Sequence, residues 1–445
     1  MEGTPAYVLD GFTKRNRKIV DLIANDDRPF DDFRKYDLSN FFYSLGDDPL
    51  SPLIPFSGWH RQAYEGGYYL YSEQLQTEPS PRIDVRNGKT GEVQNLVNLS
   101  SYNYLGIACR NEVKEAASAA IRKYGLGASG SPILSGTFDV HVDLAEALAK
   151  FKNTEASIIF PTGYSTNVGF ISGLMRPGDT LFLDQYSHAS IVDGSILAKS
   201  KTVFFRHNNP RDLERKIANV RGKKLVVVEG VYSMDGDICD LPEILDVCER
   251  YGARIMVDEA HSDFIFGPNG RGIVEHFGVA DRVDFHVGTM SKTLGGQGGF
   301  LCGSQELIDY VSAYGRSRLF SCNVPPALAV GMLTGLHICE KEPELRERLW
   351  RNASYLRERF HGEGVDIGNS NSHIMPVMVN DDAKVFAIAE KAKDRGLFVQ
   401  PAVFPAVRKN KSRLRISVSA MHSEDELDHA AQVIATILKE EGIGA

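Results

Sequence analysis

The sequence contains no uninterrupted apolar run approaching the roughly 18 residues that a transmembrane helix needs. Its first stretch, MEGTPAYVLDGFTKRNRK, has charges scattered through it and lacks the apolar centre of a secretory signal. Both absences argue against a membrane-spanning or secreted protein, so we expect a soluble, cytoplasmic one. They leave open a peripheral contact between the N-terminal arm and a membrane.

The sequence also lacks closely spaced cysteine pairs and an excess of basic over acidic residues. The six cysteines are scattered with no CxxC pair, which argues against a disulfide framework and against a zinc site. Lys and Arg number 50 against 58 Asp and Glu, for a formal net charge of −8. A nucleic-acid-binding protein would show a basic surface, so we do not expect that class. A small anionic ligand needs only a few local cations and remains compatible with this balance.

Several common functional motifs are missing. The stretch PTGYSTN (161–167) has no GxxxxGK[ST] pattern and is not a P-loop. His261 follows DEA, but HExxH is absent, which argues against a zinc protease. SMDGD (233–237) resembles part of a calcium loop, yet no ligating Glu follows at the required position. GxSxG is absent as well, which removes the usual nucleophile elbow. We therefore expect no metal site.

From about residue 95 the sequence alternates between strand-like and helix-compatible segments, which is typical of a mainly parallel sheet built from βαβ units. The strand-like runs are SIIF (157–160), TLFL (180–183), TVFF (202–205), KLVVVEG (224–230), RIMVDEA (254–260), DFHVG (284–288) and GGFLCG (298–303). Only about ten residues separate the last two, too few for a crossover helix. We expect that pair to be antiparallel.

Composition divides the chain into three parts. Residues 1–94 are rich in aromatics, Pro and Gly with poor periodicity, and predict an irregular arm that packs on another element or subunit. Residues 95–325 predict a large α/β domain with a seven-stranded sheet between helices. Residues 326–445 predict a smaller α+β domain, where helical stretches lead to short strand-like runs. Asp139 and Ser423 are candidate N-caps of two amphipathic helices.

Chemically capable residues follow the strand runs. Ligands of open α/β sheets bind at the carboxyl ends of the strands, so these positions are the best site candidates. They are Gly163, Tyr164, His188, Ser233, Asp258, His261, Thr289, Ser291 and Lys292. Taken singly, each has an ordinary explanation: a lone lysine is usually a surface charge, and a lone aspartate is often a cap.

Taken together, they match the needs of a pyridinium cofactor. Such a cofactor needs an acid at its ring nitrogen and a lysine that forms a Schiff base with its aldehyde. It also needs backbone N–H groups at a helix start, with nearby hydroxyls, for its phosphate. Asp258, Lys292, the pair Gly163 and Tyr164, and Thr289 with Ser291 supply these groups.

The chain resembles the α-oxoamine synthases, a group of fold-type I pyridoxal-phosphate (PLP) enzymes, and within it looks most similar to the serine palmitoyltransferases. The resemblance runs from about residue 98 to 422. It is carried by NLSSYNYLG, HVDLAEAL, FPTGYSTN, DQYSHASIVDG, SMDGD, VDEAHS, GTMSKTLGGQGG, FSCNVPP and RLRISVSAMH. It implies a PLP-dependent acyltransferase that condenses a small amino acid (serine, alanine or glycine) with an acyl thioester, releasing CO2 and a thiol. Acyl-CoA, sphingolipid biosynthesis and a homodimer with shared sites are implied with it.

The resemblance also implies roles for individual residues. Lys292 would hold the cofactor and act as the base at Cα, Asp258 would pair with the pyridine nitrogen, and His188 would stack on the ring. Ser233 and His261 would contact the phenolic oxygen region, and Gly163, Tyr164, Thr289 and Ser291 the phosphate. Arg415 would bind the substrate carboxylate, for which a planar guanidinium is suited. Asn103 is a substrate contact or a turn residue.

Two positions depart from the family pattern. Pro132 stands where many relatives have Arg, and Cys322 stands where many have a Thr that reaches the neighbouring subunit's phosphate; Ser321 is the candidate substitute. An aminotransferase or lyase, or a non-catalytic partner subunit, remains an alternative function. The amino acid, the acyl length and the thioester carrier (CoA or a carrier protein) stay open. Gln297 has no assigned role.

Overall fold

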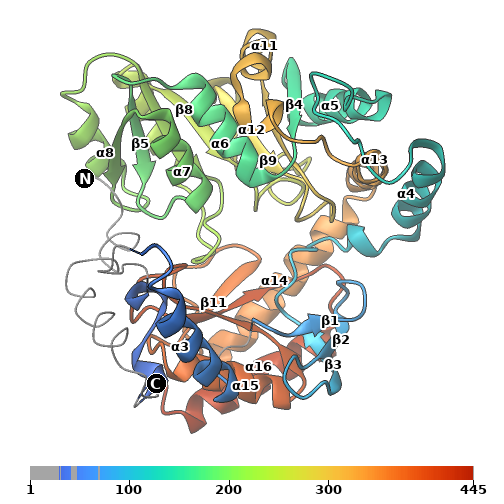
Figure 1. Cartoon of the computed structure of the whole chain (residues 1–445), viewed down its shortest axis with the longest axis vertical. Coiled ribbons are helices and arrows are strands. Elements are labelled where there is room, and N and C mark those ends of the chain that lie inside the picture. Colours follow the sequence, from blue (N-terminus) through green and yellow to red (C-terminus); the bar gives the residue numbers. More distant parts are fainter. Residues whose placement is uncertain (1–29, 31, 42–47, 69–70, 444–445) are drawn as a thin grey trace.

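The computed structural model describes residues 30, 32–41, 48–68 and 71–443, and the remaining positions of the expected N-terminal arm lie outside the described residues. The chain forms two lobes (Figure 1). One lobe holds the large sheet and its covering helices. The other holds the C-terminal elements together with the described N-terminal segments. The domain boundaries after residues 94 and 325 stay predictions.

The large sheet has seven strands in the order β4-β10-β9-β8-β7-β5-β6. These strands are β4 (Ala156–Phe160), β5 (Thr180–Asp184), β6 (Lys201–Phe205), β7 (Lys224–Glu229), β8 (Arg254–Asp258), β9 (Phe285–Thr289) and β10 (Gly299–Gly303). β10 pairs antiparallel with both β4 and β9, and the other pairs are parallel. The predicted mainly parallel α/β fold and the antiparallel final pair are both confirmed.

Two smaller sheets lie in the other lobe, in the orders β1-β2-β3-β12 and β11-β14-β13. Their strands are β1 (Gln74–Leu75), β2 (Arg82–Arg86), β3 (Val93–Asn98), β11 (Ile374–Met378), β12 (Leu397–Phe398), β13 (Gln400–Ala402) and β14 (Arg413–Ser417). The expectation of an irregular arm is therefore wrong for its described end. Strands β1 to β3 pair there antiparallel with one another, and β12, from far along the chain, adds a parallel partner to β3.

The helices separate and cover these sheets. They are α3 (Leu53–Glu65), α4 (Asn111–Tyr124), α5 (Asp139–Lys152), α6 (Gly163–Leu174), α7 (Ala189–Ala198), α8 (Pro210–Ile217), α9 (Leu241–Arg250), α10 (Ile273–His276), α11 (Gln305–Tyr314), α12 (Arg316–Leu319), α13 (Pro326–Lys341), α14 (Glu344–Gly362), α15 (Lys384–Asp394) and α16 (Glu424–Glu440). Short 3-10 helices are η2 (Phe33–Lys35), η3 (Leu38–Asn40), η4 (Ile107–Cys109) and η5 (Ala280–Arg282). Ser423 caps α16 as predicted, since its hydroxyl accepts from Glu426 N. Asp139 is instead the first residue of α5, because Phe138 holds the cap position.

The large sheet is buried on both faces, which explains its continuous apolar runs. Strand β7 illustrates this: every residue from Leu225 to Glu229 is buried. Separate apolar clusters pack on the two sides of the sheet. A third cluster joins Trp59 and Phe41 of the N-terminal segment, and the ring of Tyr68 packs against Phe386 of α15 with their centroids 4.3 Å apart. Among the described residues, no helix is long and apolar enough to cross a bilayer.

Candidate active site

A pocket of about 260 Å³ lies where strands β7, β8 and β9 end and helix α6 begins. It is lined by Thr162, Gly163, Tyr164, Asn167, His188, Ser190, Glu229, Asp258, Ala260, His261, Val287, Gly288, Thr289, Ser291 and Lys292. The structure thus brings together most of the residues that the sequence suggested for one cofactor. They converge because the carboxyl ends of parallel strands share one edge of the sheet.

The N-terminus of α6 forms one end of the pocket. The Thr162 hydroxyl caps the helix by accepting from Ser165 N at 2.9 Å. A Cβ at Gly163 would lie 2.9 Å from Thr289 Oγ1, so only glycine allows this close approach. Gln297, for which the sequence suggested no role, donates to the Pro161 carbonyl just before this turn at 3.4 Å. The helix start therefore presents backbone N–H groups to an anion beside the Thr289 hydroxyl.

Asp258 ends strand β8 as a buried carboxylate. Its Oδ2 accepts from Asn167 Nδ2 at 2.8 Å, and its Oδ1 accepts from the backbone N–H of Ala260 at 3.0 Å. Hydrogen bonds of this kind stabilise the ionised carboxylate. Asn167 was missed from the sequence, although it lies four residues after Gly163 and so faces the same side of α6.

Asn167 also fixes the tautomer of His188. Its Nδ2 donates to Ser190 Oγ at 2.9 Å, and that hydroxyl lies 2.7 Å from His188 Nδ1. The Ser190 backbone N–H points to the same nitrogen at 3.3 Å. Nδ1 is therefore the acceptor, and the neutral ring carries its proton on Nε2. Desolvation lowers the pKa of His188, with the Asp258 charge opposing and the Lys292 charge reinforcing the shift.

Lys292 lies in the loop between β9 and β10, and its amine faces two carboxyl groups. Burial lowers the pKa of Lys292 to about 8, although Asp258 and Glu229 act in the opposite direction. Glu229, also missed from the sequence, is buried at the end of β7 and accepts from the backbone N–H of His188 at 2.5 Å. Burial and the neighbouring Asp258 raise the pKa of Glu229 well above its ordinary value. An amine with such a pKa is partly neutral near neutral pH and can act as a nucleophile or base.

His261 also lines the pocket. Its Nδ1 and the Tyr104 hydroxyl are 2.8 Å apart, a buried contact between residues distant in sequence. Burial, followed by the charge of Lys292, lowers the pKa of His261 well below its ordinary value. Burial also raises the pKa of Tyr104 to about 12. Both side chains are therefore neutral over the physiological range.

Arg415 lies on strand β14, in the lobe that holds the C-terminal elements. Its Nε donates to the Ser233 carbonyl at 2.6 Å and its Nη1 to Ser417 Oγ at 2.8 Å. Its Nη2 is buried without a hydrogen-bond partner among the described residues. The guanidinium lies 4.8 Å from the ring centroid of Tyr102. An unpaired buried donor of this kind is suited to bind an anionic group.

Four sequence candidates do not line the pocket. Ser233 lies beyond it, on the wall of a neighbouring cavity. Asn103 uses its amide in a local turn, donating to the Pro79 carbonyl and accepting from Ala108 N, both at 3.2 Å. Ser321 and Arg415 are not among the lining residues either. The roles suggested for all these residues stay predictions.

The pocket fits PLP in the type and placement of its groups. A buried carboxylate, a lysine, a flanking imidazole, a helix N-terminus and hydroxyls surround one volume. The Oδ1 atom of Asn167 is buried there without a partner among the described residues. Thr289 donates its hydroxyl proton to the Gly298 carbonyl, which leaves Ser291 as the hydroxyl able to turn toward a phosphate. No cluster of metal-ligating side chains occurs in the described part of the chain.

This sheet topology and this set of groups define a fold-type I PLP-dependent transferase. A sequence model of the family described as aminotransferase class I and II matches residues 94–434, and the chain belongs to that family. Within it the chain is an α-oxoamine synthase, a PLP-dependent acyltransferase that catalyses a decarboxylative condensation.

Three relatives support the narrower assignment. The chain is 38% identical to 8-amino-7-oxononanoate synthase 1 of Bacillus velezensis over 83% of this chain and 93% of that protein. It is 38% identical to serine palmitoyltransferase of Sphingobacterium spiritivorum over 84% of this chain and 93% of that protein. The serine palmitoyltransferase of S. paucimobilis, solved with PLP and myriocin bound, has a TM-score of 0.84 at 33% identity, covering 89% of this chain and 99% of that one.

Proposed function

We propose that this enzyme condenses serine with a long-chain acyl thioester, giving a long-chain α-amino ketone of the kind that sphingolipid synthesis requires. A bond forms between the amino-acid Cα and the acyl carbonyl carbon, and the thioester C–S bond breaks. The bond from Cα to the carboxylate also breaks, releasing CO2. The Cα proton is removed before condensation, and a proton returns to that carbon after CO2 leaves. The leaving thiolate takes up a further proton.

The observation that carries the proposal is that Lys292, whose pKa burial lowers, lies close enough to Arg415 for the guanidinium charge to lower that pKa further, while Arg415 Nη2 is buried and unpaired among the described residues. Lys292 Nζ, with its lowered pKa, would take the Cα proton and return it. Arg415, with a buried and unpaired Nη2, would hold the amino-acid carboxylate. The cofactor, when bound, supplies an electron sink for the charge left on Cα.

The remaining pocket residues would hold and orient the cofactor. Asp258, fixed by Asn167, would pair with the pyridine nitrogen. His188 would stack on the ring, and its Nε2–H is free to donate to the phenolic oxygen or the substrate. The backbone N–H groups of Gly163 and Tyr164 and the Ser291 hydroxyl would bind the phosphate. Thr289 would hold Ser291 in place.

Likeness to solved serine palmitoyltransferases supports serine as the amino acid. The match to this chain covers 99–100% of the length of those structures, with TM-scores of 0.84 and 0.85. The 8-amino-7-oxononanoate synthase of Francisella tularensis matches with a TM-score of 0.68. A second candidate is the reaction of the 8-amino-7-oxononanoate synthases, which the 38% identity to a curated member favours. Both products carry an amine beside a ketone.

A substrate matrix separates these candidates. The PLP-loaded enzyme is incubated with serine, alanine or glycine and with acyl-CoA of increasing chain length, while thiol and CO2 release are followed. We expect equal thiol and CO2 release that depends on both substrates and is fastest with serine and a long acyl chain. Amino-group transfer to a keto acid without thioester consumption would contradict the proposal. A preference for alanine would move the assignment to the second candidate.

We further propose that the enzyme is a cytoplasmic homodimer. Ser321 does not line the pocket of its own chain, so as a phosphate contact it would act across a subunit interface. Light scattering of the purified enzyme gives the oligomeric state. A Ser321→Ala variant should bind PLP more weakly, and unchanged affinity would remove Ser321 from the site.

A further inference from the structure

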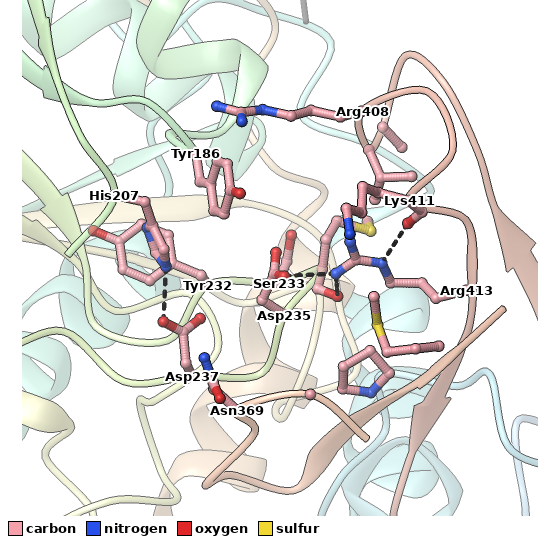
Figure 2. A pocket seen from close by; sticks show the side chains of 16 residues that line it. Tyr186, His207, Tyr232, Ser233, Asp235, Asp237, Asn369, Arg408, Lys411 and Arg413 are labelled. Carbon is pink, nitrogen blue, oxygen red and sulfur yellow. Dashed lines mark hydrogen bonds and ion pairs between the residues drawn. The ribbon is translucent and has the colours of Figure 1, made fainter. Parts of the chain in front are cut away.

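A second cavity of about 330 Å³ is lined by residues that include Tyr186, His207 and Arg413 (Figure 2). The large domain contributes the residues that follow strands β5 and β6 and the loop after β7. The small domain contributes residues of β11 and the segment 406–413. The cavity therefore opens at the same carboxyl edge of the sheet as the cofactor pocket, where ligands of α/β folds bind.

Residues of the loop after β7 separate this cavity from the substrate position. Ser233 lines the cavity, and its carbonyl accepts from Arg415 Nε. Two residues earlier on β14, Arg413 Nη1 donates to the Met234 carbonyl at 2.9 Å and to Asp235 Oδ1 at 2.6 Å. Arg413 and Arg415 lie on the same face of their strand because side chains alternate along it. A ligand that contacts Ser233 in the cavity would thus be separated from Arg415 by that one residue.

Most charges in the cavity wall are already paired. His207 contacts Asp184 at 3.0 Å and Asp237 at 2.7 Å. Burial lowers the pKa of His207, but the hydrogen bonds to these two carboxylates outweigh it and raise the pKa to about 10. Arg413 is likewise paired with Asp235 at 2.6 Å.

Two cations at the rim are not committed in this way. Arg408 lies over the ring of Tyr186, 5.5 Å from its centroid, and Lys411 of the same segment also lines the cavity (Figure 2). Within the described parts of the chain, neither takes part in an ion pair at 4.0 Å or less. Lys409, between them in sequence, is instead paired with Asp37 at 2.8 Å and lines a different cavity.

The inner wall offers hydrogen-bonding groups and apolar surface. The Tyr232 hydroxyl and Asp237 Oδ1 are both buried without partners among the described residues. Burial raises the pKa of Tyr232 well above its ordinary value, so the phenol keeps its proton and can donate. Met234 and Met378 supply apolar contacts. A small inorganic anion would leave these groups unused, and a cationic ligand would face Arg408 and Lys411.

We propose that this cavity binds the 4′-phosphopantetheine arm of the acyl thioester, with its phosphate between Arg408 and Lys411. The amide N–H groups of the arm donate to Asp237 and its carbonyls accept from Tyr232, while its methylenes pack on the methionines. The thioester end then passes Ser233 and Arg415 toward Lys292. This inference rests on the proposed condensation and adds to it the position of the carrier. CoA and carrier proteins share this arm, so the substrate series must distinguish them.

The test compares thioesters of one acyl chain on pantetheine, which lacks the phosphate, and on phosphopantetheine, which carries it. The measured quantity is the ratio of kcat/KM for the phosphorylated to the unphosphorylated thioester. In the double variant Arg408→Gln/Lys411→Gln this ratio should fall about tenfold, since each cation contributes a charge-assisted contact. The matched variant Lys409→Gln removes one neighbouring charge and should leave the ratio unchanged. An equal ratio in wild type and double variant overturns the inference.

Two further measurements identify the carrier and control for misfolding of the double variant. Acyl-CoA and acyl-carrier-protein thioesters should both lose kcat/KM in the double variant, and the one with the lower KM in the wild type is the carrier used. A loss confined to CoA would assign the cations to the nucleotide phosphates and overturn the inference. In the wild type, added salt should raise the KM of the phosphorylated thioester more than that of the pantetheine thioester. If no thioester is consumed by the wild type, the proposed condensation fails, which is a separate result.

Discussion

Replacing Asn167 should weaken PLP binding, because Asn167 holds the Asp258 carboxylate in the cofactor site. Its Nδ2 is one of the two donors identified on the Asp258 carboxylate, at 2.8 Å in a buried position. Removing a hydrogen bond to a buried charged group costs about 1.5–3 kcal/mol. In Asn167→Ala we therefore expect PLP affinity to fall between about 10-fold and 150-fold. Asn167→Asp should be worse, because it would put a second carboxylate beside the first.

PLP affinity is measured by titrating apoenzyme with cofactor and following its visible absorption band. Asn352→Ala is the matched control, because Asn352 also donates twice through Nδ2, to the carbonyls of Ser419 and His422 at 2.9 Å, away from the pocket. This control should unfold at lower denaturant concentration while binding PLP normally. If Asn167→Ala bound PLP as tightly as the control, Asn167 would have no part in supporting Asp258.

Three other outcomes are expected. Lys292→Ala should lose turnover and the visible band of the lysine-bound cofactor, and full activity would contradict the mechanism. In the wild-type apoenzyme, the rate of PLP incorporation should rise with pH through about 8 and then level off, because the neutral amine of Lys292 attacks the aldehyde. This rate is measured by stopped-flow absorbance. A rate independent of pH from 6 to 10 would refute the lowered pKa of Lys292. His207→Gln should cost about 3 kcal/mol of unfolding free energy at low pH. Because the folded pKa of His207 is raised to about 10, its stabilisation is complete below its ordinary pKa and is lost as pH rises toward 10, so urea titrations of wild type and variant should converge there.

The sheet could be predicted from the sequence because its signals are local. Each buried strand of the large sheet is a short apolar run, and the short gap before β10 already excluded a parallel crossover. The N-terminal strands were missed although β2 alternates charged and apolar residues and pairs locally with β1 and β3; only the pairing of β3 with β12, about 300 residues apart, leaves no local pattern. The cap of α5 was misplaced by one residue for a smaller reason: Asp139 accepts from Val140 N, and so resembles a cap without preceding the helix.

The site was predictable where the chemistry requires a particular residue type after a strand. Lys292 and Asp258 satisfy that condition. Tyr104 and Glu229 do not, since a tyrosine before a turn and a glutamate ending a strand have no distinctive pattern. Only the folded chain places the Tyr104 hydroxyl 2.8 Å from His261, across 157 positions of sequence.

The pairing of Glu229 with Asp258 explains which of two adjacent acids can serve the cofactor. The two residues are partners in register on neighbouring parallel strands, so their carboxyl groups share one edge of the pocket. Two close carboxylates in a buried site do not readily ionise together. Asp258 accepts from Asn167 and from Ala260 N, whereas among the described residues Glu229 accepts from His188 N, and burial raises the pKa of Glu229. Asp258 is therefore the better placed of the two acids to face a pyridinium, while Glu229, whose pKa burial raises, holds the backbone N–H of His188.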